Sequence, residues 1–315
     1  MNVASAVVLF IVGLGLVIYF AEKLVKGAVG TSVGFGISAF LVSVIFIGFD
    51  PENLAVGAVG SFEGVAGIAL GSVIGAAMVA IALAFGITAL IAPMQFEQAP
   101  KRVLVVPILA VLLTSILAFD SQLSRADGAI LLIGFALSAV YLLFLSRRGL
   151  DIKPAGEVAE TLEETDELSK WKSLGLLVLS LAAIIAGSEM LVRGAEVIIG
   201  QVDLSDTVFG MTILAFLVSI EELAREIPAA RKGRAEITFG NVAGSILAFF
   251  LFNAGIIALV RPVPVDTQTL TFYLPFCLGT VIVISVFMAT RSVPRWAGAL
   301  LVLLYLGFVL PGYLL

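Results

Sequence analysis

Ser188–Ala195 reads SEMLVRGA, and a similar pattern occurs in the first half of the chain, where Ala21–Ala28 reads AEKLVKGA. A second match follows in the same order, since Gly71–Gly75 reads GSVIG and Gly240–Gly244 reads GNVAG. The second pair of segments is slightly farther apart than the first pair, which indicates a small deletion in the first half, upstream of Gly71. Apolar helices rich in Gly and Ala resemble one another by composition, but two ordered matches inside similar hydropathy patterns favour an internal repeat.

The composition around these matches is that of a membrane protein. Of the 315 residues, 60% are hydrophobic and 13% are charged, and the mean hydropathy is +1.15. An ordinary soluble domain is about 45–50% apolar and about 25% charged, so this composition excludes a soluble globular enzyme. Histidine is absent and Cys277 is the single cysteine, which excludes disulfide frameworks, Cys/His zinc sites and His-based catalysis. We expect no enzyme, no cofactor and, without a basic patch, no nucleic-acid partner.

Ten apolar segments are long enough to cross the hydrocarbon core of a bilayer, which takes roughly 20 helical residues. They cover about residues 3–20, 34–61, 66–92, 103–119, 127–146, 173–192, 205–230, 236–260, 269–289 and 295–313. Each half then holds five spans, and because five is odd the second half enters from the opposite side. We therefore predict an all-α membrane protein of about ten transmembrane helices, built as two inverted five-helix repeats. Transporters use this architecture, with the ion site near the midplane.

Three regions follow from this pattern: a first transmembrane repeat over residues 1–146, an acidic cytoplasmic loop over 147–172, and a second repeat over 173–315. Fourteen of the 18 Lys and Arg residues fall in the odd-numbered loops. The positive-inside rule then places these loops in the cytoplasm and both termini outside. We expect an integral protein of a prokaryotic-type plasma membrane, in contact with lipid. The sequence makes no prediction of its oligomeric state.

Acidic residues occur inside two of the spans. The second span contains Asp50 and Glu52, and the seventh contains Glu221, Glu222 and Glu226. A charge at bilayer depth costs at least about 2.5–3.5 kcal/mol on insertion scales, so these acids must face a cavity, a cation, a proton or a basic residue. An internal salt-bridge cluster around Arg225 is the alternative to a cation site, because Arg225 follows Glu221 and Glu222 at helical spacing. A single Arg balances only one of the five charges.

Residues that supply neutral oxygen atoms accompany these acids. Pro51 removes a helical hydrogen bond, and a broken helix frees carbonyl oxygens that suit a hard cation together with carboxylates. Ser72 at the start of the third span, and Asn241 and Ser245 at the start of the eighth, would add side-chain oxygen ligands. Close packing of small residues between helices is the alternative interpretation of these positions.

The same residues resemble the two alpha repeats of the calcium/cation antiporter superfamily, which includes sodium/calcium and calcium/proton exchangers. The sodium/calcium type carries GTSLPE in the second and seventh spans, and GNxxGS at the start of the helix after each. Gly240–Ser245 matches the second element closely, and Gly71–Ala76 matches it less closely. The resemblance covers nearly the whole chain. It implies antiport of Ca²⁺ against Na⁺ or H⁺, with one glutamate per repeat as a Ca²⁺ ligand.

The family glutamate of the second repeat corresponds to one clear position in this chain. In the first repeat two neighbouring residues could correspond to it. Gapless spacing places Glu222 on the family glutamate of the second repeat. The same spacing in the first repeat leads to Asn53, but Glu52 follows a proline, as the family glutamate does. A one-residue shift of register would make Glu52 the ligand, so we favour Glu52 and keep Asn53 as the alternative.

Other positions depart from the family pattern. The Thr and Ser of GTSLPE are replaced by Phe49 and Asp50 in the first repeat and by Val218 and Ser219 in the second. Further along the following helices, where sodium/calcium types often carry Asn or Asp, this chain has Ala80 and Phe249. The family uses such hydroxyl and amide groups as sodium ligands, so the resemblance leaves Na⁺ and H⁺ coupling both open.

The prediction is a secondary active antiporter that exchanges Ca²⁺ for Na⁺ or H⁺ by alternating access at a midplane carboxylate site. The predicted ion ligands are Glu52, Glu222, Asp50, Ser245, Asn241, Ser72 and Ser219. Glu221, Glu226 and Asn53 are predicted to carry protons or shape the entry field, and Arg225 to balance charge. Two alternatives remain. One is an ion-binding or sensing membrane protein of the same fold that does not transport, and the other is a cation channel that uses the same acids.

Overall fold

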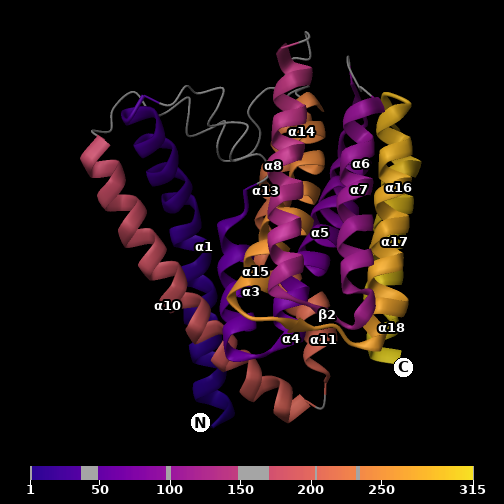
Figure 1. The fold of residues 1–315 in the computed structure, drawn as a ribbon. Coiled ribbons are helices and arrows are strands. Elements are labelled where there is room, and N and C mark those ends of the chain that lie inside the picture. Colours follow the sequence, from indigo (N-terminus) through magenta and orange to yellow (C-terminus); the bar gives the residue numbers. More distant parts are fainter. Residues whose placement is uncertain are drawn as a thin grey trace.

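The structure, a computed structural model, describes residues 2–36, 49–96, 101–147, 170–202, 204–231 and 235–314 (Figure 1). The elements of the first half are α1 (Val3–Gly34), α3 (Pro51–Glu63), α4 (Ala66–Leu70), η1 (Gly71–Gly75), α5 (Ala76–Met78), η2 (Val79–Ala84), α6 (Phe85–Ile91), β1 (Met94–Gln95), α7 (Lys101–Leu117), η3 (Ala118–Asp120), β2 (Gln122–Leu123) and α8 (Arg125–Arg147). Those of the second half are α10 (Lys170–Val202), α11 (Asp206–Phe209), η5 (Gly210–Leu214), α12 (Ala215–Val218), α13 (Glu221–Arg231), α14 (Ala235–Leu247), η6 (Ala248–Asn253), α15 (Ala254–Val260), β3 (Val263–Pro264), η7 (Thr269–Tyr273), α16 (Leu274–Ala289), β4 (Ser292–Val293), α17 (Arg295–Val309) and α18 (Pro311–Leu314).

The predicted spans correspond to helices of this structure. Within the described residues, nine helices are long and apolar enough to cross a membrane, and they match every predicted span except the second. The second span is described only from Phe49 onward, where α3 supplies 13 helical residues. The first and sixth spans are longer than predicted, at 32 and 33 residues, because both helices continue past the charged residues at which the predicted spans ended.

Helices α1 and α10 lie side by side along one flank of the bundle (Figure 1). Glycines permit the close approach: a methyl group on Gly27 would lie 2.6 Å from the backbone nitrogen of Leu177, and one on Gly194 would lie 2.8 Å from that of Phe10. The two contacts are equivalent, because aligning AEKLVKGA with SEMLVRGA pairs Gly27 with Gly194 and Phe10 with Leu177. The two segments thus occupy matching places in the two halves.

Two short β-pairs show that the halves are inverted relative to each other. β1 pairs antiparallel with β4, and β2 pairs antiparallel with β3. When GSVIG is aligned with GNVAG, β3 is the counterpart of β1, and β4 is the counterpart of β2 with a shift of one position. Each strand of one half therefore pairs with the non-equivalent strand of the other half, as a twofold axis relating the halves requires. Two of the loops predicted to be cytoplasmic hold β1 and β4, and two predicted to be external hold β2 and β3.

The same relation extends into the core helices. In that alignment η2 and α6 coincide with η6 and α15, residue for residue. The packing of these helices recurs as well, since a methyl group on Gly86 would lie 3.0 Å from the carbonyl oxygen of Gly298, and one on Gly255 would lie 3.0 Å from that of Gly128. The repeat predicted from two short motifs therefore extends to the core helices that the structure describes. Both chain termini lie at the end of the bundle that holds β2 (Figure 1).

The topology can be tested with two equivalent positions. Gln122 and Ser292 are the first residues of β2 and β4, and both are exposed. In a background without the buried Cys277, we expect Gln122→Cys to react with a membrane-impermeant maleimide from outside intact cells. Ser292→Cys should react only after the cells are opened. Reaction of both cysteines from the same side would contradict the inverted arrangement.

Candidate functional site

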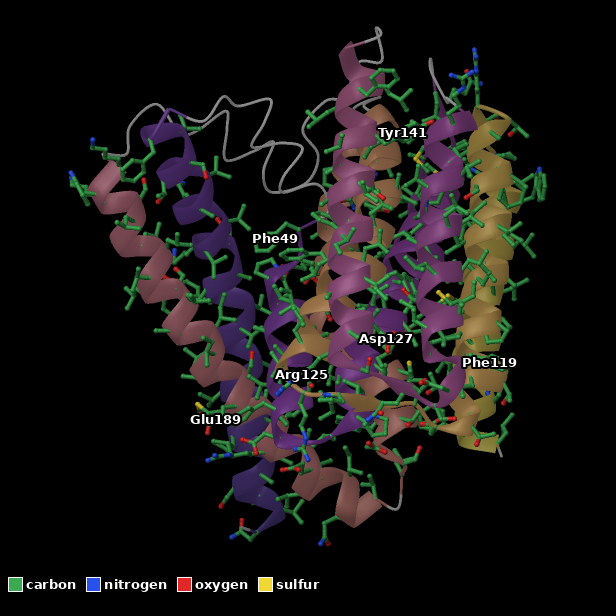
Figure 2. All side chains as sticks on the ribbon, viewed as in Figure 1. Phe49, Phe119, Arg125, Asp127, Tyr141 and Glu189 are labelled. Carbon is green, nitrogen blue, oxygen red and sulfur yellow. The ribbon has the colours of Figure 1, made fainter. Side chains whose placement is uncertain are left out.

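The first part of the candidate site is the start of helix α3. Asp50 caps this helix, and its Oδ1 accepts a hydrogen bond from the backbone nitrogen of Asn53 at 2.8 Å. Pro51 occupies the first helical turn, where its missing N–H costs nothing. A helix of this length spans about 20 Å, so Asp50 lies well inside the bundle. The neighbouring Phe49 lies about midway between the two ends of the bundle (Figure 2).

The seventh span is broken at the place equivalent to the start of α3. α12 ends at Val218, and α13 begins at Glu221 after the two non-helical residues Ser219 and Ile220. One span over residues 205–230 was predicted here, because no proline marks the break. Pseudosymmetry is the signal that could have revealed it, since the alignment of GSVIG with GNVAG pairs Ser219 with Asp50.

A hydrogen bond joins the start of α3 directly to the break between α12 and α13. Asn53 Nδ2 donates to Asp50 Oδ2 at 2.9 Å and to Ser219 Oγ at 2.9 Å. All three side chains are buried, and Asp50 is only 4% exposed. Asn53 therefore fixes the carboxylate of the first half against the broken helix of the second.

A second polar group lies on α13 and α14. Asn241 Nδ2 donates to Glu222 Oε2 at 2.9 Å and to Glu226 Oε1 at 3.2 Å. Glu222 is 3% exposed and Glu226 is 2% exposed. One neutral amide thus holds two buried carboxylates that lie one helical turn apart.

The two polar groups are electrostatically connected. The charge of Asp50 interacts with those of Glu221 and Glu222, and the charge of Glu222 interacts with that of Glu226. Like charges in a low-dielectric interior repel strongly, so a cation or proton bound between them is stabilised. Acids of both halves therefore contribute to the electrostatic potential of the same region of the bundle.

The other predicted residues are placed around this centre. Glu52 is fully buried on α3. Ser72 is buried against Gly57 and donates to the carbonyl oxygen of Ala69 at 2.8 Å. Ser245 is buried on α14 and Glu221 is partly exposed at the start of α13. The predicted role of Arg225 concerns a side chain outside the part of the chain that the structure describes, and residues 148–169 of the predicted acidic loop also lie outside it.

The described residues do not by themselves form a cage of acids. No three Asp or Glu side chains among them are grouped closely enough to hold a metal ion. A hard cation here would therefore need oxygen atoms from amides, hydroxyls, carbonyls or water in addition to the carboxylates.

Three glycines bring the halves together beside this centre. A methyl group on Gly210 would overlap the carbonyl oxygen of Gly67, and one on Gly71 would overlap the backbone of Gly210. The backbones of α4–η1 and α11–η5 therefore cross in direct contact, with Ser72 immediately after the crossing. Gly71 belongs to a repeated motif and was recognised in the sequence, whereas Gly67 and Gly210 belong to none and were not.

Similarity to known proteins agrees with this architecture. The sequence model described as "Sodium/calcium exchanger protein" matches residues 5–144 and again residues 172–311. The putative antiporter CaxA of Alkalimonas amylolytica is 30% identical over 83% of this chain and 82% of its own length. Sodium/calcium exchanger MaX1 of Methanosarcina acetivorans is 24% identical over 96% of both chains.

The fold is also that of a solved exchanger. The sodium-calcium exchanger NCX_Mj, in crystals soaked with Na⁺ and Sr²⁺, matches with a TM-score of 0.61 and 26% identity over 97% of both chains. The family model covers both halves separately, as the inverted repeat requires. The chain is therefore an integral membrane protein, and it belongs to the sodium/calcium exchanger protein family.

Proposed function

We propose that this protein is a secondary active antiporter that exchanges Ca²⁺ for Na⁺ or H⁺ by alternating access. The observation that supports it best is the meeting of the start of α3 with the break between α12 and α13, with Asp50 and Glu222 buried there. Buried carboxylates are costly in a membrane interior unless an ion or proton offsets their charge. Membership of an exchanger family supports the same conclusion.

We assign the ion site to the space between the two polar groups. Asp50 and Glu222 would supply the charges, and Ser219, Ser72, Ser245 and the amides of Asn53 and Asn241 would supply neutral oxygen atoms. In the present geometry Asn241 donates to Glu222. A flip of the amide exchanges its oxygen and nitrogen positions, so Asn241 Oδ1 would face a cation that enters between the carboxylates.

The departures from the family pattern bear on the coupling ion. Phe49, Val218, Ala80 and Phe249 replace residues that carry hydroxyl or amide oxygens in sodium/calcium types, and Val218, Ala80 and Phe249 are buried. We therefore propose that Na⁺, if transported, is held by fewer side-chain ligands here. Glu221 and Glu226 remain candidates for carrying protons. We also retain the orientation with both termini outside and loop 147–172 in the cytoplasm.

Transport by purified protein in liposomes tests the function. We expect Ca²⁺ to enter the liposomes only when an outward gradient of Na⁺ or of protons is imposed. The gradient that drives the uptake identifies the coupling ion. Ca²⁺ flux without any counter-ion would instead indicate a channel. Ca²⁺ binding without flux under either gradient would indicate a sensor.

Two variants in the same assay identify the acid of the first half. We expect Asp50→Asn to lower Ca²⁺ uptake by about tenfold or more, because its charge interacts with that of Glu222 and about 1.4 kcal/mol corresponds to a factor of ten. Glu52→Gln should have a smaller effect. A larger loss in Glu52→Gln than in Asp50→Asn would identify Glu52, the residue favoured from the sequence, as the ligand.

A further inference from the structure

The hairpin of α13 and α14 carries polar groups beyond the proposed ion site. These helices are adjacent in the chain and in space, and Asn241 faces Glu222 and Glu226 across the hairpin. The two helices run antiparallel. Starting from a contact between them, the next turn along α13 therefore lies beside the preceding turn of α14. One turn after Glu222 is Glu226, and one turn before Asn241 is Thr238. The register therefore places Thr238 at the level of Glu226.

Both of these residues have polar atoms that make no hydrogen bond within the described part of the chain. Thr238 is 1% exposed, and neither Thr238 Oγ1 nor Glu226 Oε2 has a hydrogen-bond partner among the residues that the structure describes. Buried polar groups are nearly always satisfied, by protein, water or an ion. A carboxylate oxygen and a hydroxyl oxygen left open at the same level of two facing helices are the ligands that a hard cation takes.

The first half has no such arrangement. In the alignment of the two halves, the counterpart of Glu226 is Gly57 and the counterpart of Thr238 is Ala69. The space in front of Gly57 is filled, because a methyl group there would overlap Ser72 Oγ and Ile257 Cδ1. The polar pair is therefore an asymmetric feature of a pseudosymmetric protein, present only toward the end of the bundle at which α13 ends.

Among the side chains that the structure describes, Glu226 is the principal charge at this level. α13 packs against α14, η2 and α6, and neither η2 nor α6 contains an ionisable residue. Glu222 is the acid whose charge interacts with that of Glu226. The side chains of Arg225 and Glu236, on α13 and α14, lie outside the described part of the structure.

We propose that Glu226 and Thr238 form a second cation site, one helical turn from the main site. Its ligands are the Glu226 carboxylate, the Thr238 hydroxyl, Asn241 Oδ1 after an amide flip, and water. Its occupant is a hard alkali or alkaline-earth cation that passes between the main site and the side of the membrane at which α13 ends. This inference rests on the proposed function, because Asn241 is shared by both sites.

Equilibrium binding to the full-length protein in detergent tests the proposal without requiring transport. Radioactive Ca²⁺ and Na⁺ are titrated separately, and we expect two classes of site for at least one of the two ions. Thr238→Val, which keeps the side-chain shape, and Glu226→Gln should each weaken the same class by about tenfold or more. The other class should persist in both variants.

The matched control is Thr269→Val. Thr269 on η7 is also fully buried, and its hydroxyl likewise has no partner among the described residues. We expect this variant to keep both classes, which separates loss of a ligand from loss of a buried hydroxyl. A single class in the wild-type protein, or two unchanged classes in Thr238→Val, would overturn the second site and leave the proposed function standing. Absence of any binding that depends on Glu222 would count against the proposed function as well.

Discussion

A Glu222→Gln variant is expected to lose Ca²⁺ transport, with uptake falling by on the order of 100-fold, which corresponds to about 2.7 kcal/mol. Glu222 is buried at the start of α13, accepts from Asn241 and interacts with the charge of Asp50. Glutamine keeps the shape but removes the charge, and a divalent cation then faces one carboxylate fewer in a medium that screens little. The measurement is gradient-driven uptake of radioactive Ca²⁺ by proteoliposomes.

A carboxylate far from the proposed ion site provides the control for this variant. Glu63 is the last residue of α3 and pairs with Arg193 at 3.7 Å. Glu63→Gln removes the same unit of charge from an equivalent half-helix, and exposed ion pairs of this kind contribute little. We expect its uptake to stay close to that of the wild-type protein. Uptake by Glu222→Gln at a similar level would remove Glu222 from the ion site.

The fold was largely predictable because membrane constraints make sequence patterns explicit. Every span must be apolar over about 20 residues. Lys and Arg residues concentrate in the loops on the cytoplasmic side, so successive loops alternate between rich and poor in basic residues. An odd number of spans per repeat then dictates inversion. The structure confirms this through β-pairs and π-helical segments that no sequence pattern indicated, such as η2 and η6, which occupy equivalent places in the two halves.

For the candidate site, the sequence indicated the region more clearly than the individual contacts. Neighbouring residues on a helix point about 100° apart, so a one-residue ambiguity between Glu52 and Asn53 decides which side chain faces the second half. The proline before Glu52 suggested one register, and gapless spacing suggested the other. In the structure Asn53 makes the hydrogen bond to Ser219.

Long-range packing accounts for the residues that the sequence did not reveal. Thr238 acquires its significance only from the hairpin register that brings it level with Glu226. Gly67 and Gly210 meet although they belong to opposite halves of the chain, and neither is part of a recurring motif. Such contacts depend on how two helices cross, which periodicity within one helix does not determine.

The helix crossing leads to the second large effect that we expect. A methyl group on Gly210 would overlap the carbonyl oxygen of Gly67, and both groups belong to backbone. No side-chain rotation can relieve the overlap, so the two segments must move apart. Overpacking of a tight core typically costs about 1–3 kcal/mol and sometimes more. We expect Gly210→Ala to lower the free energy of unfolding by about 3 kcal/mol or more, and to lower the apparent melting temperature of the purified protein.

Gly15→Ala is the comparison that isolates the crossing. An added methyl group on Gly15, in the middle of α1, meets no atom within 4 Å, and alanine is favoured over glycine in helices by up to about 1 kcal/mol. Its melting temperature should therefore equal or exceed that of the wild-type protein in size-exclusion thermostability measurements. Because Ser72 directly follows the crossing, surviving Gly210→Ala protein should also bind Ca²⁺ more weakly. Equal melting temperatures for the two variants would show that the halves do not meet at Gly67 and Gly210.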